Sequence, residues 1–206
     1  MSTVTRPAAA SVAKFALHVG LWLPACFAAW YFGARYLAPI VGDAALALVR
    51  LARPGLVAAL ERQDLVLVFV TSIEVHPQPG QTGVLLVEVN PLLYTAGLPL
   101  FLALMLASRA RWWTLLVGAL LLLPFQAWGV AFDFLAQVGV KAGPEVSARA
   151  GLLGWRAEAV ALSYQLGSLV FPALVPAALW MAFNRPLLAS LVQRAADPRE
   201  PTAAVK

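Results

Sequence analysis

Residues 112–135 read WWTLLVGALLLLPFQAWGVAFDFL and contain a single ionisable side chain, Asp133. The hydrocarbon core of a bilayer is about 30 Å thick and a helix rises about 1.5 Å per residue, so a span needs roughly 20 mostly apolar residues. This run is long enough and apolar enough to meet that requirement. It predicts a transmembrane helix and therefore an integral membrane protein.

The composition of the whole chain agrees with a lipid environment. Of its 206 residues, 61% are hydrophobic and only 12% are charged, whereas about a quarter of an average soluble domain is charged. One cysteine excludes a disulfide framework, and two histidines with that thiol are too few for an ordinary structural zinc site. The net charge is +5, but no basic stripe interleaved with aromatic residues indicates binding to nucleic acid.

Three further windows predict spanning helices, at residues 15–37, 91–107 and 160–183, and the second of these is the shortest. Basic residues gather before the first span, in the turn between the second and third, and after the fourth. Because short basic loops resist translocation, these three places should share the cytoplasmic side. The sequence therefore predicts an all-α integral membrane protein with four transmembrane helices and with both termini, residues 1–14 and 184–206, in the cytoplasm.

The two ends of the chain carry further expectations. The first apolar run is too long for a cleavable signal peptide, so we expect it to remain as a helix. Within it, Cys26 follows Pro24, which fits a lipoprotein cleavage box poorly, and a packed or lipid-facing thiol is favoured over lipidation. Residues 195–206 are polar and interrupted by proline, which predicts disorder.

The segments predicted outside the membrane, on the periplasmic side, are residues 38–62, 63–90 and 136–159. The first is rich in Ala, Leu and Val with interspersed charges, and Pro54-Gly55 interrupts it. Two short amphipathic helices on the outer membrane surface are the simplest interpretation. The last segment is Gly-rich with mixed charges and predicts a loop that holds at most a short turn of helix.

The middle segment, residues 63–90, changes its pattern. Residues 65–75 and 84–90 are dominated by apolar and β-branched side chains, and a Pro/Gly/Gln cluster separates them, which predicts a β-hairpin. Two strands alone are marginally stable. The hairpin must therefore either lie on the outer helices and the membrane surface, or pair its open edge with a strand or extended peptide of a partner.

Polar side chains inside a bilayer are costly, and their positions are the best indication of function in such a chain. On the helical rise, several of them fall within about 10 Å of the outer interface. They act either as hydrogen bonds between helices or as a docking surface for another protein. The candidate residues for binding a partner or substrate are Asn90, Tyr94, Gln126, Asp133, Glu158, Tyr164 and Gln165.

The sequence offers no catalytic constellation. A nucleophile needs a base within reach and an orienting group behind the base, but Cys26 has no histidine or arginine at helical spacing. His76 is predicted as an exposed loop side chain. Asp133 and Glu158 would pair only if the third and fourth helices adjoin, and no histidine accompanies them to hold a metal. We therefore predict no catalytic, cofactor-binding or metal-binding residues, with a stand-alone membrane enzyme as a rival hypothesis.

Four groups of motifs follow one another along the chain. They are Leu21–Pro24 with Trp30-Tyr31, Glu88–Tyr94 with Gly97–Leu100, Pro124–Val130 with Asp133, and Tyr164–Gly167 with Pro172 and Pro176. In this order and spacing the sequence resembles the family of exosortase H-associated membrane proteins, over most of the chain up to about Arg185.

The resemblance implies an accessory of exosortase H, a bacterial inner-membrane enzyme similar to sortases that processes proteins bearing a C-terminal sorting signal. It implies association and not catalysis, because exosortases use a cysteine nucleophile with basic partners and this sequence lacks that set. The expected partners are an exosortase H-type enzyme, membrane lipid and substrate proteins with a sorting signal. A small self-oligomerising transporter or channel, lined by Gln126, Asp133 and Gln165, is the alternative.

Overall fold

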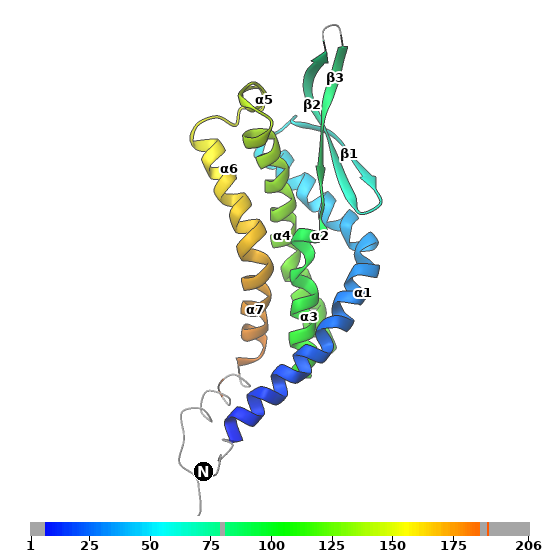
Figure 1. Ribbon diagram of the computed structural model, residues 1–206, viewed down its shortest axis with the longest axis vertical. Coiled ribbons are helices and arrows are strands. Elements are labelled where there is room, and N and C mark those ends of the chain that lie inside the picture. Colours follow the sequence, from blue (N-terminus) through cyan, green and yellow to red (C-terminus); the bar gives the residue numbers. More distant parts are fainter. Residues whose placement is uncertain (1–6, 79–80, 186–188, 190–206) are drawn as a thin grey trace, which may run out of the picture.

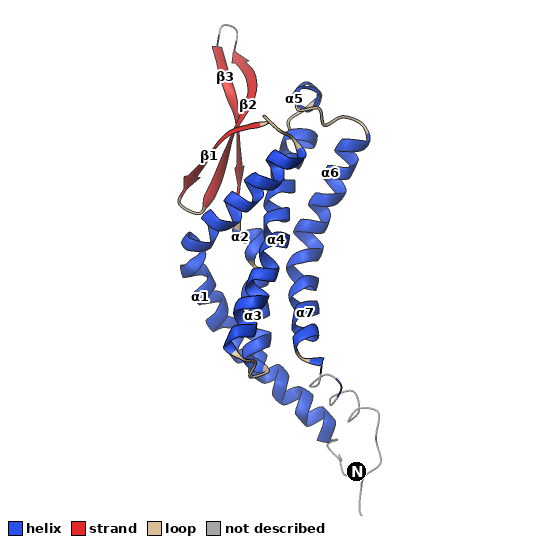
Figure 2. Cartoon of the chain, turned by 180° about the vertical axis from the view of Figure 1, so that it is seen from behind, coloured by secondary structure: helices blue, strands red, loops and turns tan. Residues whose placement is uncertain are grey.

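The apolar runs of the sequence fold into helices along the length of the molecule, and a small antiparallel sheet lies at the end remote from the beginning of the first helix (Figures 1 and 2). This arrangement comes from a computed structural model that describes residues 7–78, 81–185 and 189. We call the end that carries the sheet the sheet end. The tail predicted to be disordered, residues 195–206, lies outside the described residues.

Helix α1 (Pro7–Ala52) is a single helix of 46 residues. The sequence predicted a span ending at residue 37 and two short interfacial helices over residues 38–62. The two short helices are wrong, because the first part of 38–62 prolongs α1 and its last part forms a strand. The membrane boundary at residue 37 stays a prediction. Pro39 lies inside the helix, where a proline removes one hydrogen bond and can bend a helix without ending it. The break comes at Pro54-Gly55, where Gly55 adopts a φ of 80°.

The sheet has three antiparallel strands in the order β1 (Val57–Gln63), β2 (Val66–Gln78) and β3 (Gln81–Val89). The predicted hairpin is confirmed as β2 and β3, but the sequence did not predict β1. This strand joins β2 through the two residues Asp64 and Leu65, and Asp64 has a positive φ of 53°, as tight hairpin turns require. One edge of the hairpin is therefore filled by the chain itself.

The sheet packs one face against α1 and α4 (Trp112–Ala136). The side chains of Leu67 and Phe69 alternate inward along β2, and both are almost fully buried. The Phe69 ring stacks on the Phe134 ring of α4 at a centroid distance of 4.6 Å. A Cβ atom on Gly42 of α1 would lie 2.9 Å from the Leu67 side chain. The hairpin thus lies on the helices, as one of the two sequence interpretations expected.

The remaining helices follow the sheet in chain order. They are α2 (Leu92–Thr95), α3 (Gly97–Ala107), α4, the π-helix η1 (Gln137–Lys141), α5 (Pro144–Arg149), α6 (Trp155–Gln165), the π-helix η2 (Leu166–Val170) and α7 (Phe171–Phe183). Much of the loop predicted over residues 136–159 is therefore helical. Figure 1 shows α4 running through the middle of the molecule, with α1 and α6–α7 on its two sides.

Three of the described helical segments are long and apolar enough to cross a membrane: Ala13–Ala52, Trp112–Lys141 and Trp155–Phe183. The fourth predicted span corresponds to Leu92–Ala107, which is apolar but shorter. Four transmembrane helices are therefore not confirmed. Away from the sheet, Phe101 of α3 and Leu122 of α4 form a second buried cluster with Met105. Gly118 of α4 permits this close crossing, because a Cβ atom there would overlap the Phe101 ring.

Candidate partner-binding site

The candidate site begins where β3 ends and α2 starts. Asn90 is exposed at this junction, and its Oδ1 accepts a hydrogen bond of 3.0 Å from the backbone N–H of Leu92. A short polar side chain at such a position satisfies a free N–H at the beginning of a helix. Asn90 therefore has a local structural role, because its hydrogen bond stabilises the passage of the chain from the sheet into α2 and α3.

Tyr94 of α2 and Asp133 of α4 form the centre of a buried polar cluster. The Tyr94 hydroxyl lies beside the Asp133 carboxylate, and Tyr164 of α6 is their neighbour. Exposed fractions are 3% for Tyr94, 4% for Gln126 and 7% for Asp133. A carboxylate is this well buried only where other groups replace its water. We call Tyr94, Gln126, Asp133, Gln137 and Tyr164 the polar cluster.

Gln137 connects the polar cluster to the sheet. Its side-chain Nε2 donates one hydrogen bond to the backbone carbonyl of Glu88, at 2.9 Å, and another to Asp133 Oδ1, at 3.3 Å. The first bond uses a carbonyl at the edge of β3, and the second bond partly compensates the Asp133 charge. The polar cluster is therefore continuous with the free edge of the sheet.

Two glycines allow the helices around the cluster to come close together. The Tyr94 ring lies over Gly129, where a Cβ atom would be 2.7 Å from Tyr94 Cγ. Gly167 of η2 approaches the same residue, since a Cβ atom on Gly167 would be 2.9 Å from the Gly129 Cα. Small residues bring helix backbones together in membrane proteins in this way.

The two π-helices flank the polar cluster. In η1, Lys141 places its ammonium group 5.1 Å from the centre of the Tyr164 ring, a cation–π contact between η1 and α6. In η2, the helix widens just before Pro172, which has no N–H to donate to the preceding turn. In the same π-helix, the Ser168 hydroxyl donates to the Tyr164 carbonyl at 2.8 Å. Single π-turns are frequent at functional sites.

A small cavity of about 10 Å³ lies next to the cluster. Among its lining residues are Tyr94, Gln126, Gly97 and Pro172, so polar and apolar groups share its wall. This volume is close to that of one water-sized probe. The cavity has room for no larger ligand, so any binding by these residues must use their exposed sides or a rearrangement of the helices.

The structure brings together only part of the predicted set. Tyr94, Asp133 and Tyr164 lie close together, Gln126 lines the small cavity beside Tyr94, and Asn90 lies at the end of β3. Glu158 and Gln165 are exposed on α6. Among the hydrogen bonds of the described residues, neither of their side chains joins the cluster.

Sequence reasoning missed Gln137 and Lys141. Both lie in the segment that was predicted as a loop, where polar side chains carry no signal. Their positions at helical spacing after Asp133 would have indicated that α4 continues, because residues four apart share a helix face. The chemistry of the assembled group is that of hydrogen bonding, with one carboxylate, amides and phenols. Within residues 7–78, 81–185 and 189, no three His, Cys, Asp or Glu side chains gather as metal ligands would.

The comparison with protein families decides the identity. The family model of exosortase H-associated membrane proteins matches residues 9–187. The chain belongs to this family. The resemblance found in the sequence motifs is therefore confirmed, and the matched range includes the sheet, the polar cluster and all the long apolar helices. The family description makes the chain a membrane protein associated with the exosortase H system. A search of curated proteins and a search of solved structures found no match.

Proposed function

We propose that this protein is a non-catalytic accessory of the exosortase H system in the bacterial inner membrane, and that it docks the enzyme or its substrate on the periplasmic side. Membership of the family supports the association. The long apolar helices support the location in a membrane. The docking surface that we propose is the free edge of β3 together with the polar cluster beneath it.

The proposal includes four membrane crossings, with the sheet end outside. The chain leaves the sheet at Val89 and reaches the basic turn Arg109–Arg111 through α2 and α3, and such basic turns favour the cytoplasm. Leu92–Ala107 has 16 residues and spans about 24 Å as a helix. A helix this short still suffices where its neighbours shield it from lipid, and α3 packs against α1, α4 and α7.

The observation that carries the docking proposal is the free edge of β3. β1 pairs with one side of β2 and β3 with the other, and no further strand pairs with β3 in the described part of the chain. Gln137 covers this edge at Glu88. Further along the strand, Val84 is 49% exposed and Leu86 is 56% exposed. An open edge with exposed apolar side chains is the surface to which extended peptides add as a further strand.

The test is purification of the tagged protein from its native membrane in mild detergent, followed by identification of every co-purifying chain by mass spectrometry. We expect an exosortase in near-equal amount. Leu86→Lys places a charge on the β3 edge, which discourages strand addition, and should reduce this recovery. Ala59→Lys introduces the same charge at an exposed position of β1, the opposite edge, and should leave recovery unchanged.

A second pair of variants tests the predicted polar residues, one inside the polar cluster and one outside it. Tyr94→Phe removes the hydroxyl beside Asp133, and Gln165→Leu removes the exposed amide on α6. If the double variant inserts stably and both complex formation and substrate processing are unchanged, the polar residues do not dock a partner. Recovery of self-oligomers alone would refute the accessory role and favour the transporter hypothesis. Flux assays in liposomes, with the wild-type protein and with Asp133→Asn, would then test transport.

A further inference from the structure

A pocket of about 370 Å³ lies at the far sheet end, between the end of α1, the middle of β2 and α5. Its charged lining residues are Arg53, Glu74 and Arg149. It is separate from the polar cluster and shares no residue with it. None of the sequence motifs or the docking surface described above makes use of this pocket.

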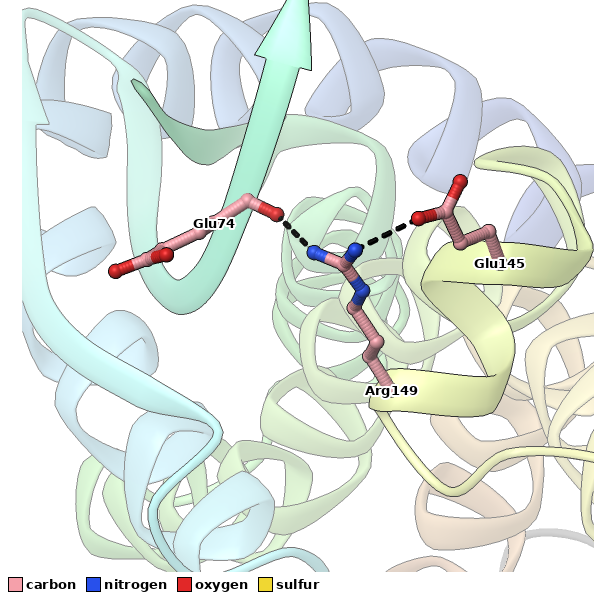
Figure 3. A network of polar contacts seen from close by, with 3 residues as sticks. All are labelled: Glu74, Glu145 and Arg149. Carbon is pink, nitrogen blue, oxygen red and sulfur yellow. Dashed lines mark hydrogen bonds and ion pairs between the residues drawn. The ribbon is translucent and has the colours of Figure 1, made fainter. Parts of the chain in front are cut away.

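Arg149 is fixed on one wall of the pocket. One guanidinium nitrogen, Nη1, donates to the backbone carbonyl of Glu74 at 2.6 Å, and the other, Nη2, donates to the Glu145 carboxylate at 2.7 Å. Figure 3 shows the guanidinium between these two oxygens, while the side-chain carboxylate of Glu74 points away from it. Arg149 thus ties α5 to the sheet, and Glu145 compensates its charge.

Arg53 stands on the other wall, and its charge is not compensated in this way. No carboxylate of the described residues lies within ion-pair distance of it, since the two ion pairs there are Arg62–Asp43 and Arg149–Glu145. The loop after α5 passes directly over its guanidinium. A Cβ atom on Gly151 would lie 2.9 Å from Arg53 Cζ, and Gly151 has a positive φ of 65°. Glycine at this position therefore leaves space for the guanidinium.

A third guanidinium adds to the positive charge of the same loop. Arg156 donates through Nη1 to the Gly151 carbonyl at 3.3 Å. Three guanidinium groups therefore lie on or beside residues 149–156, and those of Arg53 and Arg149 line the pocket. Glu145 is the one carboxylate engaged with any of them among the described residues. A planar guanidinium with free N–H groups matches the two oxygens of a carboxylate, and such bonds are about twice as strong as neutral ones.

We propose that this pocket binds an acidic side chain from an extended segment of a partner protein, with Arg53 as the main contact. The membrane placement in this argument rests on the proposed function. The helix Trp112–Lys141 has 30 residues, so its sheet end stands about 15 Å beyond a hydrocarbon core of about 30 Å. α5 and the pocket follow that end. They therefore lie beyond the lipid headgroups and face soluble, periplasmic protein segments.

The experiment uses the purified full chain in nanodiscs of zwitterionic lipid. The probe is a fluorescent six-residue peptide of alternating aspartate and serine, amidated at its C-terminus, and fluorescence anisotropy measures its binding. A peptide with asparagine in place of aspartate is the neutral comparison. We expect the acidic peptide alone to bind, and Arg53→Gln to weaken its binding about tenfold or more, as loss of a charged hydrogen bond predicts. Added salt should weaken binding as well.

Arg50→Gln is the matched control, because Arg50 is an exposed arginine one turn earlier on α1 and does not line the pocket. It removes the same charge and should change the affinity less than twofold. Arg53→Lys keeps the charge but loses the planar donor arrangement, so it should weaken binding to an intermediate degree. The thermal unfolding midpoint of each variant shows whether it is folded. If Arg53→Gln folds poorly, Arg53→Lys provides the test.

Four results would overturn the proposal. The first three are equal binding of the neutral and acidic peptides, no binding of either, and an affinity that Arg53→Gln leaves unchanged. The fourth is displacement of the acidic peptide by anionic lipid in the nanodisc, or by inorganic phosphate, at a competitor concentration below that of the peptide. The last result would assign the pocket to a phosphate group. The assay contains no exosortase, so its outcome is independent of the purification that tests the proposed function.

Discussion

Substituting alanine for Gly129 tests the closest helix contact of the polar cluster. The new Cβ atom would lie 2.7 Å from Tyr94 Cγ and 3.0 Å from Tyr94 Cβ, whereas ordinary van der Waals contacts between carbon atoms lie near 3.5–4.0 Å. The ring of Tyr94 must therefore shift by about 1 Å. Overpacking of a filled interior costs about 1–3 kcal/mol, and the shift would also separate the Tyr94 hydroxyl from Asp133.

Gly20→Ala is the control for this substitution. Gly20 also lies in a helix, but a Cβ atom there would have nothing within 4 Å. Replacing glycine by alanine inside a helix gains about 1 kcal/mol from backbone propensity, and both variants receive this gain. The difference between them therefore isolates the packing cost, which we expect to make Gly129→Ala less stable than Gly20→Ala by about 1–3 kcal/mol.

The assay is reversible unfolding of the purified protein in mixed micelles with increasing dodecyl sulfate, followed by tryptophan fluorescence. Tyr94→Ala removes the obstructing ring and leaves the Cβ atom as the one close contact of that side chain, so in that background Gly129→Ala should lose most of its packing cost, which a double-mutant cycle measures. Equal unfolding free energies for Gly129→Ala and Gly20→Ala would refute the argument. So would strictly additive effects of Gly129→Ala and Tyr94→Ala.

Three further predictions concern the rest of the molecule. Phe134→Ala removes a fully buried ring of the sheet-end core and should lower the unfolding free energy by about 3–5 kcal/mol. Proteolysis of the sheet should become faster, and unchanged stability and proteolysis would contradict the stacking of Phe134 on β2. Arg62→Gln breaks a solvent-exposed ion pair to α1 and should change stability by at most about 1 kcal/mol in the same unfolding assay. In a Cys26→Ser background, single cysteines at Asp64 and at Arg109 should react with impermeant maleimide from opposite sides of the membrane. Labelling of both cysteines from the same side would exclude the proposed topology.

Much of the helical and sheet architecture could be predicted from the sequence. The apolar runs are long and nearly free of charge, so their lengths alone indicate membrane helices at three places. The hairpin was also predictable, because Leu67 and Phe69 belong to a run of branched and aromatic side chains that only a strand accommodates well. The family motifs, which lie in these same segments, added the association with exosortase H.

Two features had no local signal. β1 includes Ala58, Ala59 and Glu61, residues that are depleted in strands, and it forms because pairing with β2 outweighs that preference. The continuation of α1 beyond residue 37 was missed because of the charged residues in that segment. Charges at Asp43 and Arg50 suggested an interfacial surface, whereas they lie on the exposed side of a helix whose other side packs at Val41, Ala45 and Val49.

The sequence allowed the polar residues of the candidate site to be predicted, because polar side chains inside a bilayer are costly. It did not allow their three-dimensional arrangement to be predicted. Spacing within a helix correctly placed Gln126 and Asp133 on one face. The contact of that face with Tyr94 depends on Gly129 and Gly167, and the position of α6 depends on the π-turn before Pro172. Such tertiary crossings leave no periodic pattern, which is why Glu158 and Gln165 were included although they are exposed.

The unbroken course of α1 has a mechanical consequence. Its first half presents large apolar side chains such as Leu21 and Phe32, which are 68% and 75% exposed, to the surroundings that we assign to lipid. Its second half is embedded in the core that holds the sheet. Pro39 lies between the two halves and can bend the helix, but the helix continues through it, so a change in tilt of the first half still moves the second half. A thicker or thinner bilayer, which changes the tilt of a spanning helix, would therefore change the orientation of the sheet and its open edge.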